Sequence, residues 1–272
     1  MAKLLLLFSL LAFLSCGGRL STIEPGEASK KTDDTSDEYA PSAKEKKPNR
    51  TAFPVKSFVK IRKTLHILEC KKIDGTVCKK GDKFGSMGSG ISIGKARGGS
   101  LLLTAGHVCH SALSSRSLNL IEKYEVIITA TNINNEEKKS VIVHHFNESN
   151  KPDLCLLFSK DLDTEGVLLA AKAPEVGEEV FGLSAPAGIF HPPTFPIISG
   201  RYSGLVDKDN AMVTVPAVGG SSGSGILNED MRLVGILFAT HPAFNVVTLT
   251  SNYHATAIFL NNALKKFAKM DI

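Results

Sequence analysis

The strongest constraint on the fold is a succession of short apolar runs that begins near residue 55 and is broken repeatedly by Gly, Pro, Asn and Asp. Short apolar runs separated by turn residues are typical of strands in all-β sandwiches and barrels, rather than of βαβ units. We therefore expect an all-β fold. The expected strands are residues 55–68, 90–93, 100–105, 124–131, 140–144, 153–158, 179–183, 212–215, 233–239 and 245–250.

The C-terminal segment departs from this pattern. Ala257, Leu260, Ala263, Leu264 and Phe267 recur at helical spacing, which predicts an amphipathic helix over residues 256–269.

The composition excludes some classes of partner. The 32 basic and 27 acidic side chains leave a net charge of +5, spread without a long basic block. Trp is absent, so the aromatic stacking platforms of nucleic-acid-binding proteins are not evident either. We therefore expect no nucleic-acid partner.

Residues 1–16, MAKLLLLFSLLAFLSC, have the pattern of an export signal. One positive charge at Lys3 precedes an apolar run that is shorter than the roughly 20 residues of a membrane-spanning helix. The ending Phe-Leu-Ser-Cys resembles a bacterial lipoprotein signal, so we expect residues 1–15 to be removed and Cys16 to carry a lipid. The alternative is an ordinary cleaved signal that happens to precede a cysteine.

Residues 16–50 differ sharply in composition from the remainder of the chain. They carry seven basic and seven acidic side chains, and Tyr39 is their only aromatic residue. Such a segment buries too little apolar surface to offset the entropy of ordering it. We expect a disordered tether over residues 16–50 and a folded domain over residues 51–272.

Two strands are expected to present residues that can carry chemistry. In residues 102–109, LLTAGHVC, an apolar strand ends in small residues and presents His107, which can act as a general base. In residues 151–158, KPDLCLLF, Asp153 opens an apolar strand, and a buried carboxylate needs a donor such as a histidine N–H. Taken singly, His107 has the plainer interpretation of a solitary core or surface histidine, and Asp153 has that of a cap at the start of a strand.

Residues 219–225, GGSSGSG, resemble the Gly-x-Ser-Gly pattern of chymotrypsin-type proteases, and the resemblance places the nucleophile at Ser222. Glycine permits backbone conformations that let N–H groups converge into an oxyanion hole, here those of Gly220 and Ser222. A flexible linker is the alternative, but expected strands lie on both sides. The order His107, Asp153, Ser222 is that of chymotrypsin, not of subtilisin or the α/β-hydrolases.

Together these stretches resemble a trypsin-like serine protease of the chymotrypsin superfamily, bacterial type, over about residues 55–267. Residues 58–61, 88–93, 104–108, 180–188 and 233–236 carry further similarity. The resemblance implies two six-stranded antiparallel β-barrels, over about residues 55–165 and 175–255, with the active site between them. It implies that His107, Asp153 and Ser222 are catalytic and that the Gly220 and Ser222 N–H groups form the oxyanion hole.

The resemblance also suggests where the substrate binds. Pro216 stands six residues before Ser222, where trypsin-like enzymes place an acidic pocket floor, so Lys and Arg would find no buried counter-charge. Phe238 stands where many relatives carry a small Ser, and Thr240 lies two residues further on. We expect a small or medium apolar residue before the cut.

Four cysteines lie beyond the signal, and an even number in an exported chain predicts two disulfides. Cys70 and Cys78 flank an Asp-Gly turn signal, so they can face each other. Cys109 and Cys155 each stand two residues beyond a proposed triad member. We favour Cys70–Cys78 with Cys109–Cys155. A Cys78–Cys109 bridge, which would resemble the family's bridge beside the catalytic histidine, is the alternative.

No spacing of His and Cys matches a zinc site, so we expect neither a metal nor a cofactor, and we expect His110, His144 and His145 to be solvated. The predicted function is a serine endopeptidase that acts on polypeptides, exported to the bacterial cell envelope and lipid-anchored, in the periplasm or at the cell surface. The alternative is a non-catalytic binding or adhesion lipoprotein that keeps the scaffold.

Overall fold

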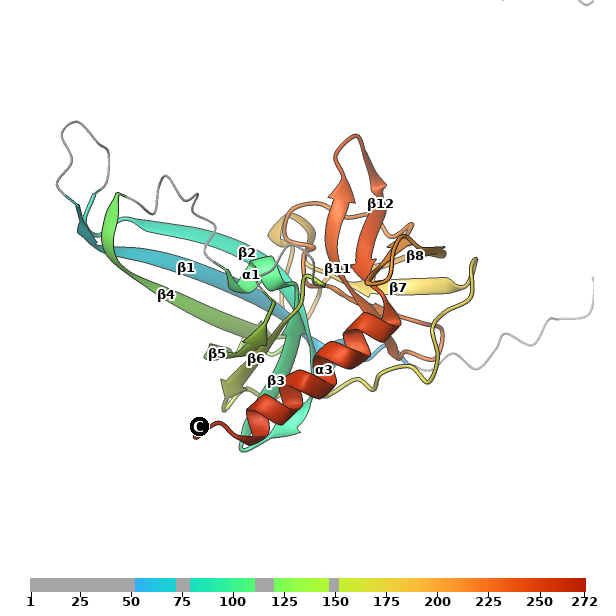
Figure 1. Ribbon diagram of the computed structural model, residues 1–272, viewed down its shortest axis with the longest axis horizontal. Coiled ribbons are helices and arrows are strands. Elements are labelled where there is room, and N and C mark those ends of the chain that lie inside the picture. The colour runs from blue at the N-terminus through green and yellow to red at the C-terminus, as the bar shows by residue number, and fades with distance from the viewer. Residues whose placement is uncertain (1–51, 72–78, 111–119, 147–151) are drawn as a thin grey trace, which may run out of the picture. The chain divides into compact units, whose positions relative to one another are not determined.

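A computed structural model describes residues 52–71, 79–110, 120–146 and 152–272 of the chain (Figure 1). The expected signal, the lipid site at Cys16 and the tether lie outside the described residues. Cys78 also lies outside them. Among the helices in these ranges, none is long and apolar enough to cross a membrane.

The first six strands close into an antiparallel barrel in the order β1-β2-β3-β6-β5-β4. The short turn η1 (Val55–Ser57) precedes them, and the turn α1 (Gly106–Cys109) comes after β3. The strands are β1 (Phe58–Cys70), β2 (Lys83–Ala96), β3 (Gly99–Thr104), β4 (Ile121–Asn132), β5 (Glu137–His145) and β6 (Cys155–Lys160). All six residues of β3 are buried, and the three consecutive leucines at 101–103 form the apolar run by which this strand was predicted.

The remaining six strands close into a second antiparallel barrel in the order β10-β11-β12-β9-β8-β7. They are β7 (Glu179–Leu183), β8 (Ile197–Leu205), β9 (Asn210–Val213), β10 (Gly225–Leu227), β11 (Leu233–His241) and β12 (Phe244–Ser251), with the turn η2 (Pro186–Gly188) after β7. The expected fold of two six-stranded barrels is therefore confirmed. Strands β8 and β10 were not expected, because β8 is interrupted by glycines and β10 directly continues the Gly/Ser run.

A C-terminal helix, α3 (Tyr253–Ala268), comes after the second barrel. Asn252 caps it by accepting the Ala255 N–H at 2.9 Å, which explains its start. Its other end is held on the first barrel, where the Arg97 guanidinium donates to the Ala268 carbonyl at 2.9 Å. The helix therefore ties the chain end back to the first barrel.

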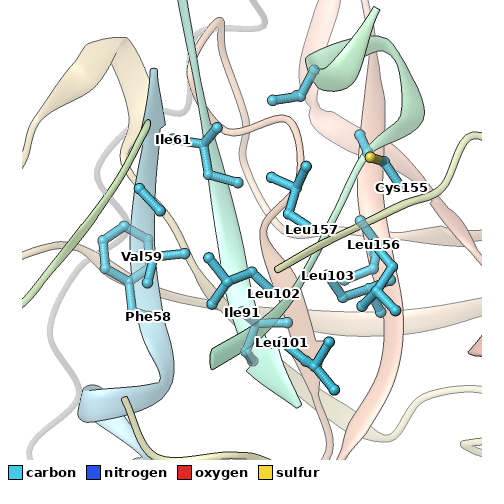
Figure 2. Packing of buried hydrophobic residues seen from close by; sticks show 14 of the residues in the cluster. Phe58, Val59, Ile61, Ile91, Leu101, Leu102, Leu103, Cys155, Leu156 and Leu157 are labelled. Atoms are coloured by element: carbon cyan, nitrogen blue, oxygen red, sulfur yellow. The ribbon is translucent and has the colours of Figure 1, made fainter. Parts of the chain in front are cut away.

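One hydrophobic cluster joins the two barrels. Around Ile91 and Leu102, side chains of β1, β2, β3 and β6 interdigitate (Figure 2). The same cluster includes Leu183 and Ile236 of the second barrel. Because this core is continuous, residues presented by different barrels are held in a defined relation to one another.

Candidate active site

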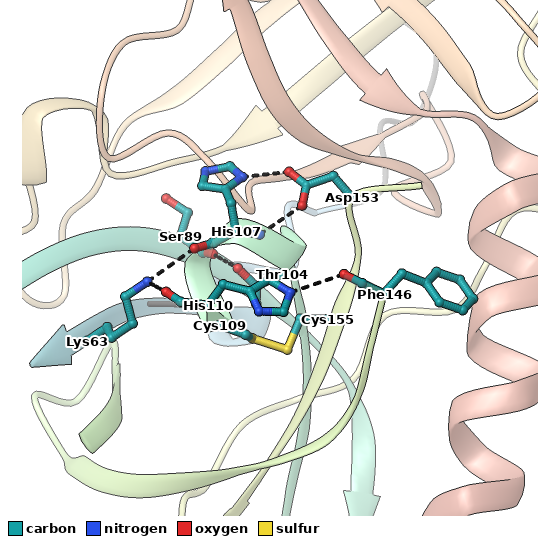
Figure 3. The surroundings of a disulfide bond; sticks show 9 residues. All are labelled: Lys63, Ser89, Thr104, His107, Cys109, His110, Phe146, Asp153 and Cys155. Atoms are coloured by element: carbon teal, nitrogen blue, oxygen red, sulfur yellow. Dashed lines mark hydrogen bonds and ion pairs between the residues drawn. A yellow bond between two sulfur atoms is a disulfide. The ribbon is translucent and has the colours of Figure 1, made fainter. Parts of the chain in front are cut away.

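His107 and Asp153 are joined by two hydrogen bonds. The backbone N–H of His107 donates to Asp153 Oδ1 at 2.8 Å, and its ring Nδ1 lies 2.5 Å from Asp153 Oδ2 (Figure 3). The two residues meet because β3 and β6 are adjacent strands, with Thr104 paired to Cys155. The His107 side chain is 49% exposed, so its other edge faces solvent. An imidazole held in this way at Nδ1 can use Nε2 as a base.

The close approach of Asp153 depends on Gly106. A Cβ at this position would lie 2.5 Å from Asp153 Oδ1 and 3.1 Å from the Leu154 nitrogen. The first distance is shorter than any non-bonded contact a real Cβ makes. A side chain at residue 106 would therefore displace the carboxylate from His107.

A disulfide lies directly beneath this pair. Cys109 is bonded to Cys155, as favoured from the sequence, and cross-links α1 to β6 (Figure 3). The alternative bridge from Cys109 to Cys78 is therefore wrong. Cys70 is also disulfide-bonded, whereas Cys78, its expected partner, lies outside the described residues.

Ser222 lies half-buried in the loop of residues 219–225, between β9 and β10 of the second barrel. Its carbonyl accepts the backbone N–H of Ser89, on β2 of the first barrel, at 2.8 Å. A Cβ at Gly88 would lie 2.9 Å from both the Ser222 carbonyl oxygen and the Val108 side chain, so this loop and the α1 turn both border Gly88. Within the described ranges, no hydrogen bond joins Ser222 Oγ to His107.

The backbone at Gly220 has a conformation that residues with a side chain rarely adopt. Its φ of +94° favours glycine, and a Cβ here would lie 2.6 Å from the Ala185 carbonyl oxygen. The preceding carbonyl, of Gly219, accepts the Ala187 N–H at 2.7 Å. Since the C=O and N–H of a trans peptide point in opposite directions, the Gly220 N–H points away from Ala187.

The backbone N–H of Ser222 is likewise oriented by hydrogen bonds to the carbonyl of its own peptide unit, which is that of Ser221. The carbonyl of Ser221 accepts both the N–H and the hydroxyl of Ser224, at 3.0 and 2.7 Å. In the described part of the chain, the N–H groups of Gly220 and Ser222 make no hydrogen bond. An oxyanion hole needs backbone N–H groups that no other acceptor uses, and these two N–H groups meet that requirement.

The sequence from residue 88 to residue 236, more than half of the chain, matches the family model of the trypsin-like peptidase domain. The chain belongs to the trypsin-like peptidase family. The matched region contains His107, Asp153 and Ser222. It begins at the strand that contacts Ser222 and ends on β11.

Solved structures of bacterial proteases share the fold of this chain. The serine endoprotease from Yersinia pestis superposes with a TM-score of 0.55 at 14% identity, over 78% of this chain and 64% of that one. The chain thus spans less than two thirds of the Yersinia chain. The active form of the Rv3671c protease from M. tuberculosis matches with a TM-score of 0.55 at 17% identity, over 76% and 81% of the two chains. Identities this low establish the fold alone, and no curated protein matches the sequence.

The three expected substrate-binding residues are all half-buried. Pro216 precedes the 219–225 loop, whereas Phe238 and Thr240 lie on β11. The Gly223 N–H donates to the Leu237 carbonyl at 2.7 Å, so β11 touches the loop just before Phe238. Phe238 also packs against the cluster that joins the barrels.

Lys63 is a residue of the site that the sequence reasoning missed. It is buried on β1, and its Nζ donates to the carbonyl oxygens of His107, at 3.2 Å, and of His110 (Figure 3). Burial lowers the pKa of its ammonium. The lysine supports the end of the α1 turn that carries His107. Strand alternation could have revealed it, since the buried residues Ile61 and Leu65 stand two positions away on either side.

The three histidines expected to be solvated are instead partly buried, because the end of β5 packs between α1 and α3. The rings of His110 and His145 meet edge to face with centroids 4.3 Å apart. His144 stacks on Phe259 of α3, with centroids 5.2 Å apart. Among the described residues, no group of three or more His, Cys, Asp or Glu side chains is placed to hold a metal ion.

Proposed function

We propose that the chain is a serine endopeptidase that cleaves polypeptides through an acyl-enzyme formed on Ser222. Two observations carry the proposal. His107 and Asp153 are joined by two hydrogen bonds, and a loop of the other barrel has two N–H groups, those of Gly220 and Ser222, that are unused within the described residues. Membership of the trypsin-like peptidase family supports the same activity.

The proposed mechanism uses these groups in turn. His107 Nε2 removes the proton from Ser222 Oγ as the oxygen attacks the scissile carbonyl. Asp153 holds the imidazole orientation and stabilises its developing positive charge. The N–H groups of Gly220 and Ser222 stabilise the oxyanion. His107 then protonates the leaving amine, and water releases the acyl group by the reverse sequence.

We propose further that the pocket takes a small or medium apolar side chain before the cut. Pro216 gives the pocket no charge to pair with Lys or Arg, and a buried cation without a partner is costly. Phe238 and Thr240, on the strand that touches the 219–225 loop, supply apolar surface and one hydroxyl.

We also propose that the peptidase acts outside the cytoplasm, lipid-anchored through Cys16 in the bacterial cell envelope. The signal-like residues 1–15 support export. The Cys109–Cys155 disulfide fits an oxidising compartment.

Labelling with a fluorophosphonate probe tests the activity. The full-length chain is compared with Ser222→Ala and His107→Ala, and cleavage of an unstructured protein is measured beside labelling. Labelling and cleavage that both disappear in the two variants would support the endopeptidase. A folded wild-type chain that neither labels nor cleaves would favour the non-catalytic binding or adhesion lipoprotein instead.

A further inference from the structure

Ser89, on β2 of the first barrel, is completely buried and makes three hydrogen bonds to the second barrel. Its hydroxyl donates to the Gly220 carbonyl at 2.9 Å and accepts the Ala185 N–H at 2.9 Å. Its own N–H donates to the Ser222 carbonyl at 2.8 Å. One serine therefore contacts the 219–225 loop and the segment packed against that loop.

Ser89 is also bonded to the strand that presents the catalytic histidine. Its carbonyl accepts the hydroxyl of Thr104 at 2.7 Å. Thr104 is the last residue of β3, three positions before His107, and Figure 3 draws its hydrogen bond to Ser89. The structure thus connects the strand of the expected base with the loop of the expected nucleophile through a single residue.

The hydroxyl of Ser89 acts on the central peptide unit of the loop. The Gly220 carbonyl belongs to the same peptide as the Ser221 N–H, which donates to the Val218 carbonyl at 2.9 Å. The peptides on either side of this unit carry the unused N–H groups of Gly220 and Ser222. The central peptide ends at the Cα atoms of Gly220 and Ser221, which the two neighbouring peptides share, so a displacement of this unit would also move the peptides that carry the donors.

We propose that Ser89 is a positioning residue for the oxyanion hole: from the first barrel, its hydroxyl sets the central peptide of the 219–225 loop. This inference rests on the proposed function. It predicts that the hydroxyl matters more for the transition state than for the bound substrate, since the oxyanion forms only as the bond is attacked.

The test compares Ser89→Ala with Ser92→Ala in the full-length chain. Ser92 is an equally buried serine of β2, and its hydroxyl accepts a hydrogen bond from the Thr164 hydroxyl at 2.7 Å, with no partner in the described part of the second barrel. Both variants lose one buried hydroxyl from the same strand. We expect kcat to fall about 10- to 100-fold in Ser89→Ala, with KM changed less than about threefold. We expect Ser92→Ala to keep the wild-type kcat.

Amide hydrogen exchange supplies a readout that needs no activity. In Ser89→Ala the Ala185 N–H loses its acceptor and the central peptide loses its anchor. We expect the amides of Ala185 and Ser221 to exchange about tenfold or more faster than in wild type, and to stay unchanged in Ser92→Ala.

The outcomes separate this inference from the proposed function. A wild-type chain without activity would defeat the proposed function, and the exchange rates would still decide whether Ser89 holds the loop. An active wild type with an unchanged kcat in Ser89→Ala would overturn the inference alone. Equal losses of kcat in both serine variants, or a rise in KM at constant kcat, would also overturn it.

Discussion

Asp153 accepts two hydrogen bonds from a single residue, His107, one from its backbone N–H and one from its ring Nδ1. The backbone bond fixes the carboxylate relative to α1, and the ring bond fixes the tautomer and rotation of the imidazole. The pair therefore depends on Asp153 both as a negative charge and as a double acceptor.

Replacing Asp153 by Asn should lower kcat/KM by about ten-thousandfold, because an amide that keeps the geometry favours the wrong imidazole tautomer. Steady-state cleavage of a peptide substrate measures the effect. Asp163→Asn is the matched control, since Asp163 is an exposed aspartate paired with Lys95 away from His107. Near-normal activity in Asp153→Asn would remove this carboxylate from the mechanism.

Gly106→Ala should sharply lower peptide cleavage while leaving the barrels folded. The added Cβ would lie 2.5 Å from Asp153 Oδ1, so the carboxylate must move away from His107. We expect kcat/KM to fall by about 100-fold or more. Gly85→Ala on β2 should be silent, because the nearest atom to its Cβ, the Lys63 carbonyl oxygen, lies 4.0 Å away. Peptide cleavage beside circular dichroism distinguishes a shifted carboxylate from lost fold.

The double substitution Cys109→Ala with Cys155→Ala should lower the free energy of unfolding by about 3–4 kcal/mol. The bridge closes a loop with a sequence separation of 46 and so restricts the unfolded chain. Removing the bridge restores the conformational entropy that the unfolded chain had lost. Urea unfolding of both proteins under oxidising conditions measures the difference. A free energy of unfolding unchanged by the double substitution would show that the bridge adds nothing to stability.

Acid should weaken the fold through His145. Burial, followed by the nearby charge of His110, lowers its pKa below the ordinary 6.5. At pH values between the lowered and the ordinary pKa, His145 binds a proton in the unfolded chain but not in the native chain. The stability that the neutral side chain contributes is therefore complete above pH 6.5 and is lost as the pH falls below 6.5.

His145→Gln should therefore flatten the dependence of the melting temperature on pH between about 7.5 and 5. His254→Gln, at an exposed position of α3, is the control and should leave that dependence as in wild type. Equal slopes in wild type and His145→Gln would contradict the assignment.

Cys16→Ser should release the protein from the membrane if the lipid is attached there. Phase partitioning in a cloud-point detergent, combined with labelling by a radioactive fatty acid, measures the change. Wild type should label and enter the detergent phase, and the variant should do neither. A variant that still labels would place the lipid elsewhere.

Much of the fold could be predicted from local patterns. The alternating and continuous apolar runs indicated most of the strands, and the register of β1 contained enough information to place Lys63 inside. Strand β10 could not be recognised, because Gly225 is at once the end of the Gly/Ser run and the first residue of a strand paired with β7 and β11. A three-residue strand is defined by its partners rather than by its own sequence.

Periodicity and short motifs were sufficient to predict the all-β class, the family and the residue types available for chemistry. The folded structure was needed to show that Cys109 bonds Cys155, that Ser89 reaches across to Gly220, and that the Gly220 and Ser222 N–H groups are unused within the described residues. The reason is that hydrogen bonds and disulfides depend on distances of a few ångströms between segments far apart in the chain, and closure of the barrels sets those distances.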